Sequence, residues 1–147
     1  MHSLFFDGAS KGNPGSAGAR GIVKNAEGLL IHRFAWGLGI NSNIQADALA
    51  LFQGLKLLLN LGIKEANIFG DSQVVIKTMV SNSSPQDLRL ARLISRIRSL
   101  EKLFQNLNFF HVLRDNNKDA DLEANKAALL SIGIMTRDGD ETWDPIP

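Results

Sequence analysis

Four aspartates in this sequence stand at the ends of predicted structural elements and are candidates for shared chemistry. Asp7 and Asp71 each follow a short apolar run, whereas Asp47 and Asp121 lie near the predicted starts of helices. A group of carboxylates with no obvious counter-charge is costly unless it is solvated or binds a cation. Because the chain has no cysteine, and because oxygen ligands favour hard cations, magnesium or manganese is expected rather than zinc.

Each of these acids also has a simpler explanation when it is considered alone. Asp7 precedes a turn rich in glycine, which is typical of a plain exit from a strand. Asp47 lies in the first turn of a predicted helix, where the helix dipole favours an acid. All four acids nevertheless fall at the ends of predicted strands or helices that can face one edge of the same sheet. This shared placement favours a metal site for the four acids together.

The first part of the chain predicts three strands. Ser3–Ala9 is rich in apolar residues, as a buried central strand would be, and it is followed by Ala17–Lys24 and Leu29–Trp36. The turn Asn25–Gly28 joins the last two as a hairpin. We therefore expect an antiparallel meander, with Asp7 at the end of its first strand.

A long helix is predicted next, from the helical spacing of apolar residues between Ile44 and Gly62. Ser42 and Gln45 have the form of a capping box at its start. The remaining predicted elements are a strand over 66–71, a helix from Ser72 to about Val80, a helix over 86–105, a strand over 108–113 and a helix over 119–132. The segment 134–147 is acidic and aperiodic, so we interpret it as a mobile tail outside a domain spanning 1–133.

This order of elements predicts an α/β fold. The fourth and fifth strands follow helical crossovers and should run parallel to the first. The result is a mixed five-stranded sheet, with three antiparallel meander strands, two parallel strands and helices on both faces. Asp7 and Asp71 would then lie at the carboxyl ends of neighbouring parallel strands, where open α/β sheets place their binding crevice.

Composition excludes several other classes of protein. The chain has 147 residues, which suits one domain, and its net charge of +1 gives no global basic field for nucleic acid. No apolar run is long enough to span a membrane, and we expect no signal peptide. The absence of cysteine fits a reducing, intracellular compartment but does not identify one. Five basic residues on the helix predicted over 86–105 could contact phosphates, although a solvated face is the favoured interpretation.

Four sequence segments carry a resemblance to a known family. They are Phe6–Ser10 with Gly12–Gly15, Asn43–Leu51, Gly70–Val75 and Arg114–Leu122. In their order and spacing they resemble type 1 ribonuclease H, particularly the reverse-transcriptase-like domains common in plant genomes and retroelements. The resemblance extends from Ser3 to about Ser131, which is nearly the whole chain.

The resemblance implies a metal site of the form Asp-Glu-Asp-Asp. Asp7, Asp71 and Asp121 match three of its acids, and Asp47 occupies the glutamate position. His111 falls roughly where the family has a catalytic histidine, but it lies within a predicted strand, so we expect a structural role. The positions that contact the hybrid in the family correspond to Gly8, Ser10, Asn13, Ser42, Asn43 and Gln73.

The implied activity is hydrolysis of the RNA strand of an RNA–DNA hybrid with two ions of magnesium or manganese, about 3.5–4 Å apart. We expect a monomer without an organic cofactor. Aspartate at position 47 is one methylene short, so activity should be reduced and manganese preferred. Ile44 replaces a frequent asparagine, and the family's basic protrusion has no counterpart between Val80 and Phe109, so hybrid binding should be weak. The alternative is a catalytically impaired domain that binds nucleic acid or protein.

Overall fold

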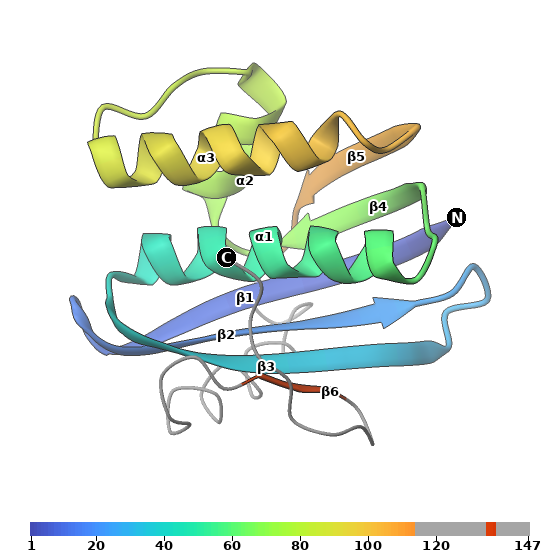
Figure 1. Cartoon of the computed structure of the whole chain (residues 1–147), viewed down its shortest axis with the longest axis horizontal. Helices are drawn as coiled ribbons and strands as arrows, with labels where there is room; N and C mark the ends of the chain where they lie inside the picture. Colours follow the sequence, from blue (N-terminus) through green and yellow to red (C-terminus); the bar gives the residue numbers. More distant parts are fainter. Residues whose placement is uncertain (114–134, 138–147) are drawn as a thin grey trace.

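The computed structural model describes residues 1–113 and 135–137, which contain six strands and three helices (Figure 1). The elements in chain order are β1 (His2–Gly12), β2 (Gly15–Lys24), β3 (Leu30–Asn41), α1 (Asn43–Asn60), β4 (Glu65–Gly70), α2 (Gln73–Ser81), α3 (Leu88–Glu101), β5 (Asn106–His111) and β6 (Met135–Arg137). The strands form one sheet in the order β5-β4-β1-β2-β3-β6. The predicted α/β class is therefore confirmed, with its antiparallel meander and its two parallel strands.

The first strand is longer than predicted, and this corrects the position of Asp7. β1 and β2 pair continuously up to the turn between Gly12 and Gly15, so Asp7 lies inside β1, opposite Arg20 of β2. Asp7 does follow the last parallel pair between β1 and β4, Phe6 with Gly70. The acid therefore marks the end of the parallel ladder rather than the end of the strand.

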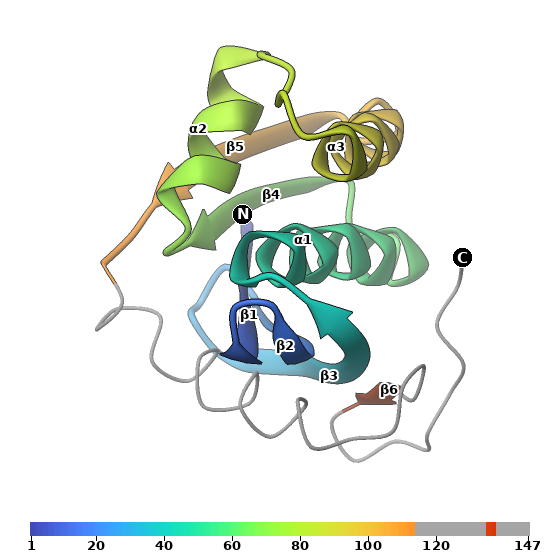
Figure 2. The same ribbon diagram turned by 90° about the vertical axis from the view of Figure 1, so that its left-hand side faces the viewer.

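One hydrophobic core joins the sheet to all three described helices. Leu4 and Phe6 of β1 are fully buried, and they contact the same cluster as buried residues of α1, α2 and α3. Gly54 allows α1 to lie close to β1, because a Cβ there would be 2.6 Å from a methyl group of Leu4. Figure 2 shows α1 and α3 side by side. This packing holds α1 against β1.

The sixth strand was not predicted. Met135–Arg137 pairs antiparallel with Phe34–Trp36 of β3, so the expected mobile tail contains three residues of sheet. Pairing through backbone groups requires no apolar periodicity, which explains why no sequence pattern indicated it. The helix predicted over 119–132, and with it the covering of the second face, lies outside the described residues. Within those residues, no helix combines the length and apolar character needed to cross a bilayer.

Candidate active site

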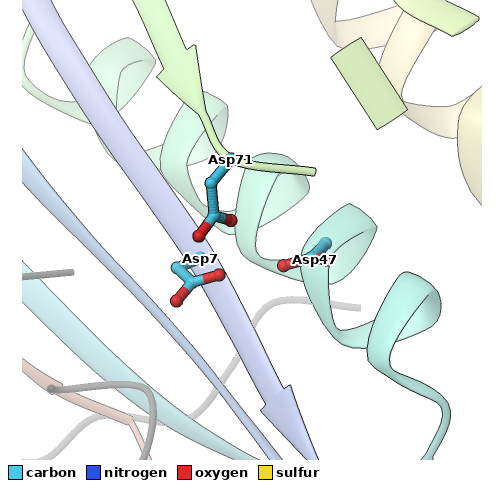
Figure 3. Close-up of side chains that lie close together, drawn as sticks. All are labelled: Asp7, Asp47 and Asp71. Carbon is cyan, nitrogen blue, oxygen red and sulfur yellow. The ribbon is translucent and has the colours of Figure 1, made fainter. Parts of the chain in front are cut away.

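Three of the four predicted acids meet at one place in the structure. One carboxylate oxygen from each of Asp7, Asp47 and Asp71 lies within 4.8 Å of those from the other two. Figure 3 shows the three side chains converging from β1, from α1 and from the residue after β4. Asp121 lies outside the described residues, so its place in the cluster stays a prediction.

Gly8 sets how closely α1, which carries Asp47, approaches β1. A Cβ at position 8 would be 2.2 Å from the carbonyl carbon of Ala46, so α1 rests directly on the backbone of β1. The Gly8 N–H donates a 2.8 Å hydrogen bond to Oδ1 of Asp47. Sequence reasoning assigned Gly8 only a contact with nucleic acid and missed this packing role, because the contact depends on the crossing of two distant elements.

Polar residues fix the start of α1. The predicted capping box is confirmed, since Ser42 Oγ accepts from the Gln45 N–H and Gln45 Oε1 accepts from the Ser42 N–H, both at 3.1 Å. Asn13 Oδ1 in the β1–β2 turn accepts from the Asn43 N–H at 3.1 Å. Ser10 Oγ donates to the Asn41 carbonyl oxygen at 3.0 Å. These bonds hold the turn, the end of β3 and the start of α1 in one arrangement.

The residues predicted to bind nucleic acid thus lie at this end of the fold. Ser10, Asn13, Ser42 and Asn43 surround the start of α1, the helix that carries Asp47. Gln73 is exposed at the first position of α2, two residues after Asp71. Their contact with nucleic acid stays a prediction.

The electrostatics of the cluster are dominated by burial. Burial raises the pKa of Asp47 from 3.8 to about 7, although hydrogen bonds from Gly8 and with the Asp7 side chain oppose this shift. The charge of Asp71 raises the pKa further. Asp7 is itself only 1% exposed. A divalent cation would favour the ionised form of Asp47, and the oxygen-only donor set of the three carboxylates fits magnesium or manganese.

A buried cation accompanies the acids, which the sequence did not reveal. Arg20 stands directly opposite Asp7 in the β1–β2 register and is 2% exposed. Residues directly opposite in an antiparallel pair present their side chains to the same face of the sheet. A lone charged residue within the small-residue run from Ala17 to Gly21 was a usable signal, but only the register links it to Asp7.

His111 lies in β5, as predicted, at the final position of the strand. Its Nε2 is 3.3 Å from the backbone oxygen of Asp71, so the tautomer protonated on Nε2 donates a hydrogen bond there. The side chain is exposed. This position does not test the role of His111, and the predicted structural role stays a prediction.

Sheet order and acid cluster together define an α/β protein with a candidate cation site at the end of its parallel ladder. The family described as reverse transcriptase-like matches residues 5–127. The chain belongs to this reverse transcriptase-like group of type 1 ribonucleases H.

Two relatives illustrate the sequence similarity. Ribonuclease HI of Halobacterium salinarum is 33% identical over 123 residues, covering 84% of this chain and 62% of that protein. A putative ribonuclease H protein of Arabidopsis thaliana is 33% identical over 135 residues, covering 90% of this chain. The chain spans only 21% of the Arabidopsis protein's length.

Solved structures agree with the fold. Ribonuclease H1 of the halophilic archaeon Halobacterium salinarum superposes with a TM-score of 0.83 at 32% identity, covering 86% of this chain and 96% of that chain. The ribonuclease H1 called LC11, solved in complex with an RNA/DNA hybrid, gives 0.82 at 26% identity, covering 87% of this chain and 96% of that chain.

Proposed function

We propose that this chain hydrolyses the RNA strand of RNA–DNA hybrids at the site formed by Asp7, Asp47 and Asp71, with Asp121 as the fourth acid. The observation that carries the proposal is the convergence of three carboxylates, from three separate elements, within 4.8 Å. The relatives named as ribonucleases H, and the similar structure solved with a hybrid, support the choice of substrate.

The four acids would hold two ions of magnesium or manganese. Bound there, the cations would activate water and stabilise the charge that develops on the scissile phosphate. The chain's own contribution is to place the ligands before substrate arrives. Gly8 orients the carboxylate of Asp47 through its N–H, and Arg20 brings positive charge to the face of β1 that carries Asp7.

Asp47 would make this enzyme weaker than members with glutamate at that position. Its side chain is shorter by about 1.5 Å, the length of one C–C bond. Because α1 already rests on Gly8, the helix cannot move further inward to close the gap. A ligand that is slightly misplaced should be tolerated better by manganese than by magnesium, which demands near-ideal octahedral geometry.

The hybrid would be held by the polar residues around the start of α1 and by Gln73. Hybrids of this kind are recognised by groove shape and by 2′-hydroxyls rather than by base sequence. Amide and hydroxyl groups of Ser10, Asn13, Ser42 and Asn43 suit such contacts, together with the Gly8 backbone. The exposed side chain of Ile44 lies next to them in the sequence and cannot form a hydrogen bond, so the affinity for the hybrid should be lower. In this scheme His111 steadies the backbone at Asp71.

A cleavage assay tests the proposal. RNA labelled at one end and annealed to DNA should be cut internally in manganese, leaving 5′-phosphate and 3′-hydroxyl products. Asp7→Asn should lower the rate by more than about 100-fold, because even the outer-shell partners of metal ligands cost about 10- to 100-fold. A thermal melt should show that the variant still folds cooperatively, so that its loss of activity reports on the site and not on unfolding.

Two outcomes would count against hydrolysis at this site. Equal cleavage by Asp7→Asn would indicate a contaminating nuclease. A hybrid that is bound but not cut in either metal would instead favour the non-catalytic binding domain.

A further inference from the structure

A groove of about 280 Å³ lies between α3 and the start of α1, outside the acid cluster. Three arginines of α3 line it, Arg89, Arg92 and Arg96, and all three are exposed. Their spacing of three and then four residues puts them on one face of the helix. Leu49 and Leu93 supply its apolar lining.

The rest of the lining is neutral and polar. Asn41 and Gln45 complete the groove, and no carboxylate is among its described lining residues. A concave surface with three guanidinium groups suits an anion with several oxygen atoms. Arginine in particular matches phosphate, because its planar fork can donate two parallel hydrogen bonds.

The groove and the acids lie on opposite sides of α1. Gln45 and Leu49 are each two positions from Asp47, so at about 100° per residue they point roughly 160° away from it. The two sites are therefore separated by about one helix diameter, on the order of 10–12 Å. The grooves of B-form DNA are about 6–12 Å wide, which sets the scale of the spacing between backbones in a duplex. A duplex with one strand at the acids can thus bring other backbone phosphates to the arginines.

Nothing else in the described structure uses the charge of two of these arginines. Within residues 1–113, Arg89 and Arg92 have no hydrogen-bond or ion-pair partner. Arg98 on the same helix is different, since it donates to the backbone oxygens of Thr78, at 3.0 Å, and Ser83.

Arg96, the third arginine of the groove, lies close to a second cationic side chain. The Arg96 guanidinium and the Lys56 ammonium each lie 4.6 Å from the centre of the Phe52 ring. Burial and then the charge of Arg96 lower the pKa of Lys56. This end of the groove is thus strongly positive although the whole chain carries only +1.

We propose that the groove of Arg89, Arg92 and Arg96 binds backbone phosphates of the duplex whose RNA strand lies at the acids. This inference rests on the proposed function and gives it a second point of contact with substrate. The sequence has no counterpart of the family's basic protrusion. The three arginines would make phosphate contacts in its place. Their contribution is independent of base sequence and should depend strongly on salt.

The test compares two double variants that remove the same charge. Arg89→Gln with Arg92→Gln removes the two unpartnered groove arginines. Lys77→Gln with Lys102→Gln removes two exposed lysines that do not line the groove. Hybrid binding is measured by fluorescence anisotropy from 50 to 300 mM salt, with Asp7→Asn added to every chain so that the hybrid stays intact.

The arginine pair should reduce the slope of log affinity against log salt by about 1.4 to 1.8, because each lost phosphate contact contributes about 0.7 to 0.9. The lysine pair should leave that slope unchanged. In chains that retain Asp7, the arginine pair should raise KM about tenfold with kcat changed less than twofold, the signature of lost uniform binding.

An unchanged slope in the arginine pair, or an equal decrease in both pairs, would overturn the assignment. Failure of the chain with all its arginines and lysines intact to bind hybrid at low salt would overturn it as well. Failure of the proposed function looks different: the hybrid would be bound with an arginine-dependent salt slope but would not be cut.

Discussion

The two sides of α1 differ in how they carry charge. On one side, Asp7 and Asp47 are buried where α1 meets β1, and Asp47 accepts a 2.8 Å hydrogen bond from the backbone. On the other side, Arg89 and Arg92 are exposed and have no partner among residues 1–113. Buried like charges destabilise a fold, whereas solvated charges cost little. Changes to the acid side should therefore alter stability and turnover, and changes to the arginine side should alter affinity.

The largest effect that separates the two sides should appear in the pH dependence of stability. In the folded chain without metal, Asp47 keeps its proton up to about pH 7, whereas in the unfolded chain it loses it near 3.8. Between these values the folded state binds more protons, so the free energy of unfolding falls as the pH rises. At about 1.4 kcal/mol per pKa unit, the total fall is at most about 4 kcal/mol.

Urea unfolding in EDTA between pH 4 and pH 8 measures this fall. Asp47→Asn should flatten the curve, and saturating magnesium should restore stability at pH 8. The arginine pair should leave the curve unchanged. A flat curve for the unmodified chain would mean that Asp47 is ionised without cost, and the contrast between the two sides would be lost.

A smaller effect is expected when the contact between α1 and β1 is disturbed. Gly8→Ala inserts a Cβ where the Ala46 backbone lies, so we expect a loss of about 1–3 kcal/mol in stability. Turnover should fall as well, because the carboxylate of Asp47 moves with the helix. Thermal melting and the cleavage assay measure the two effects.

Gly28→Ala is the matched control for this substitution. Gly28 has a φ of +83°, and nothing lies within 4 Å of the position that a Cβ would take there. The substitution should therefore cost about 1–2 kcal/mol in backbone strain alone. Similar losses of stability are thus expected, with turnover lost only in Gly8→Ala. Normal turnover in Gly8→Ala would show that the close packing of α1 does not position Asp47.

The smallest effect concerns the length of one side chain. Asp47→Glu should raise the magnesium-dependent rate about tenfold, equivalent to about 1.4 kcal/mol in the barrier. The ratio of the rates in manganese and magnesium should fall at the same time. No gain, in a variant that melts like the unmodified chain, would mean that aspartate already reaches the productive position.

Local patterns in the sequence were sufficient for most of the fold. Helical spacing and the capping box placed α1 correctly, and the crossover rule predicted the parallel direction of β4 and β5. The ends of strands were less predictable. Glycines after Asp7 suggested a turn, whereas β1 continues to Gly12 because β2 pairs with it up to that point.

The site divides in the same way. The four acids were predicted from the resemblance to ribonuclease H and from their positions at the ends of predicted strands and helices. The structure brings three of them together. The position of Arg20 opposite Asp7 depends on the register of β1 and β2. The contact of α1 with Gly8 depends on how the helix crosses the strand. Neither can be read from a short stretch of sequence. The arginine face on α3 was visible as a charge pattern, but its apposition to Gln45 across a groove required the packing of two helices.

The short strand β6 has a consequence for where this domain can be cut. It pairs with Phe34–Trp36, so a version ending at residue 133 would leave that stretch of β3 open. Unpaired strand edges recruit other chains. No candidate acid lies beyond residue 133. We nevertheless expect β6 to limit aggregation between copies of the protein, because it covers this edge of β3.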